Sequence, residues 1–340
     1  MRWRGLARLA SSVGPSCPPC SRILVDGFQS MGMANVTGIN VFDRQTKLLQ
    51  RSRAALAPDA DNYDYVKAEI GYRVADRLYD IKREMDIVVD LGCGRGHVSR
   101  HISADWVKKL VLTDHCPEWA NTAVIDPEMP AELVSRLSLC EDKDAWPFEP
   151  NSVSCFLSSL SLHWVNDLPR CLGNIASSLR PDGVLICSVF GGETLYELRA
   201  SLQLAELERE GGFAAHVSPF VRVEDLAGLL NKAGFTMLTL DSDEVVVRYP
   251  SMFEVMRDLQ GMGESSATWT RKAHLHRETL MAAAAIYREM YGFPEEDGMP
   301  EGVPATFQIL YAIGWKPDPS QPKPAARGTR LHRDFLNGRD

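Results

Sequence analysis

The sequence predicts an α/β fold, a mostly parallel sheet with helices on both faces. The segment Ile87–Leu91 is apolar without polar alternation, as expected for a strand covered on both faces. It runs into a loop with glycine at every second position, Gly92, Gly94 and Gly96. Strand-like and helical patterns then alternate along the chain, which is typical of βα units.

Two helices are expected before this strand. The segment 40–57 mixes Arg and Lys with Leu48, Leu49 and Leu56. The segment 65–81 is a clearer helix, because apolar residues recur at spacings of four, four, four and three: Val66, Ile70, Val74, Leu78 and Ile81.

The elements after the loop follow from short apolar runs, caps and helical spacing. Asp167 is a suitable N-cap with Pro169 in the first turn of the helix that follows. A run of four alanines favours a helix near 272–291. The expected strands are 110–114, 136–141, 152–160, 184–190, 235–240, 245–249 and 306–315. One helix is expected to begin at 98–102. Further helices are expected at 168–179, 193–209, 223–232, 251–262 and 272–291.

The spacing of the glycines bears on the ligand. In the dinucleotide pattern G-x-G-x-x-G the third small residue would fall at His97, so NAD fits poorly. Asp90 precedes the glycines, and Asp114 ends the next strand about 20 residues later, where an acid can bind ribose hydroxyls. Asp142 follows the third expected strand. Acids at consecutive strand ends indicate a ligand site rather than a bare turn.

Together, Asp90–Gly96, Asp114, Asp142 and the segments 157–164 and 179–183 resemble class I S-adenosylmethionine-dependent methyltransferases. The resemblance implies a Rossmann-like sheet of seven strands, with 306–315 antiparallel. It also implies that the two leading helices pack beside the sheet and partly cover the cofactor site. It implies S-adenosylmethionine as cofactor, bound by Asp90, Gly92, Gly94, Gly96, Asp114 and Asp142, the last facing the adenine amino group.

Within this superfamily the chain most resembles a branch shared by bacterial malonyl-carrier-protein methyltransferases and mitochondrial complex I assembly factors. The segments 40–44, 191–199, 258–264 and 282–291 carry this likeness, which covers about residues 38–316. It implies hydroxylation of an arginine on a core subunit of complex I during early assembly, with other assembly factors as further partners. It also implies a location on the matrix side of the inner membrane. The cofactor that would activate oxygen is not identified.

Two other functions stay open: methyl transfer to a carrier protein or small acid, and a non-catalytic assembly chaperone that binds S-adenosylmethionine. No residue is an evident catalytic base, and methyl transfer depends mainly on positioning. His163 is the one candidate, as a base, a substrate contact or a structural histidine.

No metal site is predicted. An iron oxygenase needs two histidines and a carboxylate. Near His274, the pair His276 and Glu278 would point roughly 200° apart on a helix. Cys17 and Cys20 have metal-ligand spacing, but no second pair lies near them.

The composition limits the classes of protein to which this chain can belong. The chain is 45% hydrophobic and 24% charged, as in ordinary globular proteins, and its net charge of −8 argues against a nucleic-acid binder. No apolar run reaches the roughly 18–20 residues that span a bilayer, so we expect any membrane association to be peripheral.

Both ends of the chain differ from the middle. Residues 1–25 contain four Arg and no acid, which predicts a mitochondrial transit peptide over 1–35, with a basic tail as the alternative. Without it the net charge would be −11. A methyltransferase-like domain is expected at 38–316, including the two leading helices and a helical insertion near 251–291. A disordered tail is expected at 317–340, because Pro, Arg and Gly are frequent there.

Overall fold

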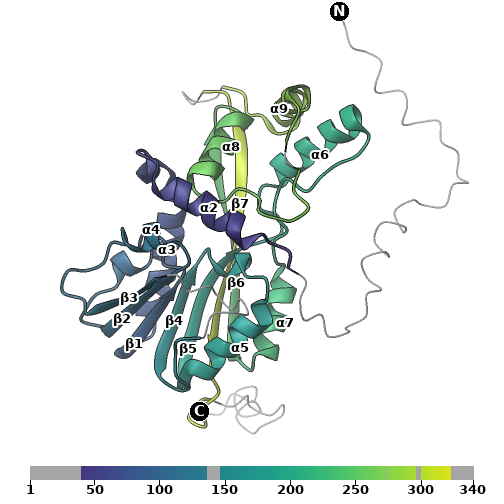
Figure 1. Ribbon diagram of the computed structural model, residues 1–340. Coiled ribbons are helices and arrows are strands. Elements are labelled where there is room, and N and C mark those ends of the chain that lie inside the picture. The colour runs from purple at the N-terminus through teal and green to yellow at the C-terminus, as the bar shows by residue number, and fades with distance from the viewer. Residues whose placement is uncertain (1–39, 136–145, 273, 296–299, 323–340) are drawn as a thin grey trace, which may run out of the picture. The chain divides into compact units, whose positions relative to one another are not determined.

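The computed structural model describes residues 40–135, 146–272, 274–295 and 300–322, all within the unit Asn40–Asp340 (Figure 1). They form a sheet of seven strands, as the resemblance implies, and the strand order is β3-β2-β1-β4-β5-β7-β6. The first five strands pair in parallel, and β7 lies antiparallel between β5 and β6. The strands are β1 Met85–Leu91, β2 Val107–Asp114, β3 Ala131–Ser135, β4 Val153–Ser159, β5 Leu179–Phe190, β6 Thr236–Tyr249 and β7 Val303–Trp315.

Helices cover both faces of the sheet. On one face α3 buries Ile70 and Val74 and packs on β4 and β5, and on the other α5 and α7 bury Ile175 and Leu230. The helices are α2 Arg44–Ala55, α3 Tyr65–Tyr79, α4 Pro117–Ala120, α5 Leu168–Ser178, α6 Tyr196–Glu210, α7 Val223–Lys232, α8 Met252–Gly261 and α9 Arg277–Tyr291. None of the helices in the described part of the chain is long and apolar enough to cross a bilayer.

The leading helices, α2 and α3, lie where the site needs them. Figure 1 shows α2 running across one end of the sheet, near α8. Helix α3 packs directly on the glycine loop, because a Cβ at Gly71 would lie 2.4 Å from the His97 carbonyl oxygen. The predicted cover over this end of the sheet is therefore confirmed.

The helix predicted after the glycine loop is wrong. The chain makes only a 3₁₀ turn, Ser99–His101, before β2 begins. The Tyr79 hydroxyl donates to the His101 carbonyl and accepts from the Ser103 amide, so these two backbone groups bond a side chain of α3 instead of continuing a helix.

The two strands predicted at 235–240 and 245–249 are one continuous strand, β6. The polar residues 241–244 separate the two predicted strands, but among the described residues β6 lies at the sheet edge and pairs with β7 alone. Asp241 and Asp243 in this middle pair with Arg77 and Arg73 of α3, so their charges are neutralised without breaking the strand.

Several other boundaries differ. Strand β3 starts at Ala131, five residues before the predicted 136–141, and that segment lies outside the described residues. Helix α9 starts at Arg277 instead of 272, and β5 starts at Leu179 instead of 184. The predicted disordered tail begins too early, since Gln321 bonds the Asp182 carboxylate and the Lys316 carbonyl.

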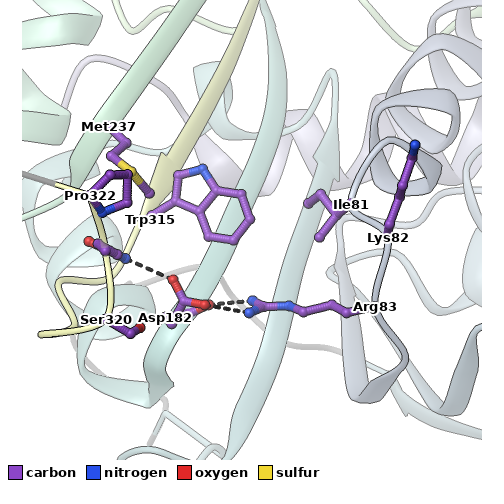
Figure 2. A pocket seen from close by; sticks show the side chains of 9 residues that line it. Ile81, Lys82, Arg83, Asp182, Met237, Trp315, Ser320 and Pro322 are labelled. Atoms are coloured by element: carbon purple, nitrogen blue, oxygen red, sulfur yellow. Dashed lines mark hydrogen bonds and ion pairs between the residues drawn. The ribbon is translucent and has the colours of Figure 1, made fainter. Parts of the chain in front are cut away.

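Gln321 also lines a cavity of about 270 Å³ (Figure 2). Arg83, paired with Asp182, and Trp315 form two of its other walls. Arg83 lies just before β1, at the opposite end of that strand from the glycine loop. None of the predicted site residues lines this cavity.

We predict that Ile70→Ala lowers the free energy of unfolding by about 2–5 kcal/mol, the usual result of deleting a fully buried side chain. Ile70 belongs to α3, and its side chain is 0% exposed in the core beneath that helix. The control Leu49→Ala, at a side chain that is 57% exposed, should change stability little. Urea unfolding measures both, and equal losses would contradict this packing.

Candidate functional site

The glycine loop follows β1 and turns sharply. Gly92, Gly94 and Gly96 have φ of +74°, +56° and +78°, which residues with a Cβ rarely adopt. A Cβ at Gly92 would lie 2.0 Å from the Ser161 Oγ. The loop therefore packs tightly against the segment after β4, where a side chain at position 92 would not fit.

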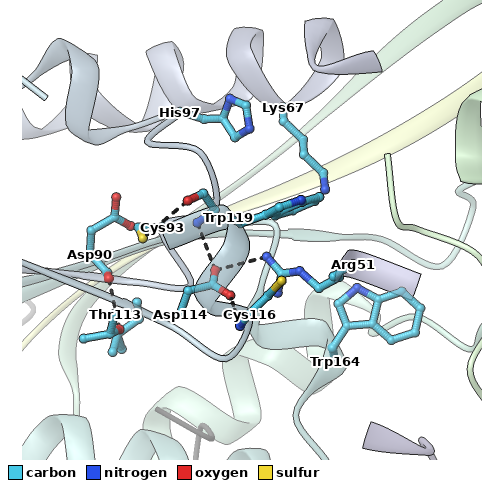
Figure 3. Close-up of polar contacts among 12 residues, drawn as sticks. Arg51, Lys67, Asp90, Cys93, His97, Thr113, Asp114, Cys116, Trp119 and Trp164 are labelled. Atoms are coloured by element: carbon cyan, nitrogen blue, oxygen red, sulfur yellow. Dashed lines mark hydrogen bonds and ion pairs between the residues drawn. The ribbon is translucent and has the colours of Figure 1, made fainter. Parts of the chain in front are cut away.

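Asp114 ends β2 beside this loop, as predicted. Its Oδ2 accepts from the Gly94 amide at 2.9 Å, and its Oδ1 from the Cys116 amide at 2.7 Å. Oδ2 also pairs with the guanidinium of Arg51 in α2, at 3.1 Å (Figure 3). The side chain of Asp114 is 0% exposed, so this acid is held by the loop and by α2 together.

Asp90 lies at the same end of the sheet with the opposite environment. It is 0% exposed, and neither carboxylate oxygen has a hydrogen-bond partner among the described residues. Burial, and then the charge of Asp114, raise the pKa of Asp90 to about 8. Asp90 is therefore a neutral acid near pH 7 and can bind a cation by releasing its proton.

A small pocket is lined by Asp90 and by Gly92 and Gly94 of the loop, whereas Asp114 lies outside its lining. The glycine loop, Asp90 and His97 form one side, and Arg51, Lys67 and Trp119 fill the other. Burial, and then the charge of Lys67, lower the pKa of His97 to about 2, so this imidazole is neutral. The other lining residues are Cys93, Val98, Ser159 and Leu160.

Glu264 lies behind Lys67. Gly263, at φ +71°, ends α8, and the Glu264 amide donates to the Leu259 carbonyl, a Schellman-type end that turns the chain inward. The Glu264 carboxylate pairs with Lys67 Nζ at 3.0 Å and accepts from Trp164 Nε1 at 2.8 Å. Burial raises the pKa of Glu264, but the charge of Lys67 and the nearby His163 outweigh it, so the carboxylate stays ionised.

His163 lies next to this carboxylate, in the turn after β4. Its Nε2 is 3.7 Å from Glu264 Oε2, longer than a hydrogen bond, and its side chain is 1% exposed. Neither ring nitrogen has a hydrogen-bond partner in the described part of the chain. Burial lowers its pKa, so the ring is neutral. It packs against Trp164, Phe190 and Phe220.

Lys47 completes the cluster from α2. It is 1% exposed, donates to the Gly263 and Ser265 carbonyls, and lies 3.3 Å from the centre of the Trp164 ring. Burial lowers the pKa of Lys47 well below its usual value. Four segments that are distant in sequence thus place ionisable side chains beside the glycine loop.

The structure brings together Asp90, the three glycines and Asp114, whereas Asp142 lies outside the described residues. Sequence reasoning missed Lys47, Arg51, Lys67 and Glu264. One signal was present: Lys47, Arg51 and Ala54 lie on one face of a helix at spacings of four and three, and all three are largely buried.

Metal ligands are a separate question. Among the described residues no group of three or more His, Cys, Asp or Glu side chains is placed to hold a metal ion. His274 and His276 lie together, with ring centroids 5.4 Å apart, but His276 only precedes the first residue of α9.

A family model described as a methyltransferase domain matches residues 65–240. The zebrafish (Danio rerio) protein named mitochondrial arginine-hydroxylase NDUFAF5 is 55% identical, over 86% of this chain and 88% of its own. Its human (Homo sapiens) namesake is 50% identical, over 96% and 92%. A Methylovorus malonyl-[acyl-carrier protein] O-methyltransferase is 30% identical, over 78% and 88%. A solved Bacillus halodurans structure, assigned to the methyltransferases, shares the fold with TM-score 0.50 and 17% identity, over 72% and 99%.

The raised pKa of Asp90 makes stability depend on pH. The native chain keeps a proton that the unfolded chain loses near pH 4. The stabilising effect is complete below about pH 4 and is lost as the pH rises to about 8. We expect Asp90→Asn, which cannot ionise, to avoid this loss of stability. In the wild type the loss amounts to at most about 1.4 kcal/mol for each pH unit.

The difference in melting temperature between Asp90→Asn and the wild type should therefore grow from about pH 5 to about pH 8. The exposed Asp76→Asn, in α3, serves as control. A difference that stays flat with pH would mean that native Asp90 is already ionised.

Proposed function

The chain belongs to the family of these mitochondrial arginine hydroxylases, within the methyltransferase superfamily, and we propose that it binds S-adenosylmethionine and hydroxylates an arginine. The proposed substrate is a core subunit of mitochondrial complex I during early assembly. The identity of 48–55% to vertebrate relatives that are named arginine hydroxylases carries this proposal. The site residues decide how far it fits this chain.

These residues fit S-adenosylmethionine. The group carries an ammonium and a sulfonium, and the buried Asp90 carboxyl, without partners among the described residues, suits a cation. Gly92 and Gly94 line the same pocket and carry no side chain that would fill it. Asp114 would accept the ribose hydroxyls. When bound, the group supplies an activated methyl or serves as a fixed ligand of the fold.

The chain's own residues account for binding and for exclusion of water. Helices α2 and α3 cover the pocket, and Arg51 holds α2 on Asp114. A ribose that bonds Asp114 must compete with this guanidinium, so we propose that cofactor entry loosens the Arg51 contact. Neutral His97 and Trp119 give the pocket an uncharged wall. The group that activates oxygen is not identified, and we derive no step through it.

Location and partners are part of the same proposal. Its supports are the word mitochondrial in the relatives' names and the basic, acid-free residues 1–25. We propose import through a leader within 1–35, residence in the matrix against the inner membrane, and contact with other assembly factors. The domain would span 38–316.

A second candidate is methyl transfer to a carrier protein or small acid. Its support is the 30% identity to malonyl-carrier-protein methyltransferases and the methyltransferase family model. A binding-only assembly chaperone is the third. Mass analysis of the core subunit separates them, because hydroxylation adds one oxygen, methylation adds one methyl, and chaperoning adds nothing.

We predict that S-adenosylmethionine raises the melting temperature of the chain without residues 1–35, as a ligand of the native state must. Asp114→Asn should weaken binding by about 1.5–3 kcal/mol, the usual loss for a bond to a charged group. Calorimetry measures the affinity, with the exposed Asp105→Asn as control. NAD should bind more weakly, and tighter binding of NAD would reverse the cofactor assignment.

We also predict that Gly94→Val abolishes the added oxygen on the core-subunit arginine. A β-branched side chain at φ +56° strains the loop, and its Cβ would lie 3.4 Å from Trp119. Cells that carry the variant at normal protein level are compared by mass spectrometry with Gly228→Val, where a Cβ meets nothing within 4 Å. Persistent oxidation in Gly94→Val cells would show that hydroxylation does not need this pocket.

A further inference from the structure

Two cations of the chain itself fill the pocket, and both lie over one indole ring. Lys67 Nζ is 4.2 Å and Arg51 Cζ 4.6 Å from the ring centre of Trp119. Each has its own carboxylate: Arg51 pairs with Asp114, and Lys67 with Glu264. An indole face beside a buried carboxylate is an arrangement that binds organic cations.

The two carboxylates differ in how many donors they already have. Asp114 accepts from two backbone amides as well as from Arg51, so three donors already occupy acceptor positions of its carboxylate. Glu264 accepts from Lys67 and Trp164. A carboxylate offers about four acceptor positions, so Glu264 has room for further donors. Replacing the Lys67 ammonium would free one more position.

A structural role explains only part of this cluster. Lys67 donates to the Met262 carbonyl, and Lys47 to those of Gly263 and Ser265, so both lysines cap the C-terminal end of α8. Capping does not require a buried carboxylate or a buried histidine with two unsatisfied nitrogens. His163 and Glu264 therefore call for another explanation.

We propose that Glu264 and Trp119 form the subsite for the guanidinium of the substrate arginine, and that the Lys67 ammonium fills this subsite in the free chain. The inference rests on the proposed arginine hydroxylation, because it assigns that substrate a place. The subsite borders the cofactor pocket, since Lys67 and Trp119 line both. The two reactants would thus meet across Trp119.

His163 adds hydrogen-bonding capacity to this subsite. Its neutral ring can accept an N–H from a guanidinium, which has five donors in a plane and so bonds a carboxylate and an imidazole at once. The ring centroid of His163 lies 4.9 Å from that of Phe190 and 5.8 Å from that of Phe220. These rings exclude water from the charged pair and strengthen it.

Lys67 is suited to give way. Burial, and then the repulsion from Arg51, outweigh the attraction of Glu264 and lower the pKa of Lys67 below its usual value. A guanidinium keeps its charge, whereas a lysine in this setting can release a proton or withdraw its flexible side chain. The arriving arginine would therefore replace one cation with another and leave Glu264 neutralised throughout.

The experiment compares Lys67→Met, the double variant Lys67→Met/Glu264→Gln and the exposed control Glu224→Gln. The double variant removes both partners of the buried pair, so that neither charge is left alone. N-acetylargininamide and its uncharged analogue N-acetylcitrullinamide serve as probes in titrations followed by NMR. S-adenosylmethionine affinity, thermal melting and oxidation of the core-subunit arginine in cells are measured alongside.

We expect the wild type to prefer the arginine probe over the citrulline probe, and Lys67→Met to bind the arginine probe more tightly. The double variant should stay folded, lose about 10- to 100-fold in affinity for it and leave the core-subunit arginine unoxidised. A folded double variant that still prefers the arginine probe overturns the subsite. Weaker binding by Lys67→Met overturns the stand-in role of Lys67.

The same measurements separate this inference from the proposed function. A wild type that prefers the arginine probe, and loses that preference in the double variant, supports the subsite even where the core-subunit arginine carries no oxygen. In that case the hydroxylation fails and the subsite stands. If the core-subunit arginine is oxidised normally in cells that carry a folded double variant, the hydroxylation stands and the subsite fails.

Discussion

Two buried carboxyl groups at neighbouring strand ends govern the electrostatics of this site. The parallel pairing of β1 with β2 places Asp90 and Asp114 at the same edge of the sheet. Two buried acids this close resist ionising together, so the environment divides them. Asp114 accepts from two amides and pairs with Arg51, whereas Asp90 receives no donor from the described residues and keeps its proton. One edge thus offers a carboxylate paired with an arginine and a neutral acid.

The cover over the site follows from this division. Helix α2 buries few apolar side chains. The face that it turns toward the site carries Lys47, Arg51 and Ala54. It is held by the Asp114 carboxylate and by carbonyls after α8, not mainly by hydrophobic packing. Contacts of this kind are directional and can be exchanged for ligand groups, whereas an apolar seam cannot. A helix bound in this way is suited to cover a pocket that must also open.

The sequence predicts the sheet well because β1, β4 and the second half of β5 are largely buried and therefore appear as mostly apolar runs. It predicts β6 poorly, since Asp241 and Asp243 resemble a turn until Arg73 and Arg77 are seen to pair with them. The loop glycines and Asp114 are local signals and are placed as expected. Glu264 is not, because its role arises from a lysine about 200 residues away, a pairing that no local pattern reports.

The fold alone does not decide between a methyl acceptor and an arginine, because one scaffold can serve many reactions. The charges that face the pocket carry more information. A malonyl group, the substrate in the name of one relative, is anionic and would be repelled by the Glu264 carboxylate. A guanidinium would be attracted by it once Lys67 withdraws. The pocket's carboxylates are matched by cations from α2 and α3, so an incoming cation need only replace one of them, whereas an incoming anion would have to displace a carboxylate from its partners. Exchange of like charge for like charge leaves the buried balance unchanged, and this favours a cationic substrate at this site.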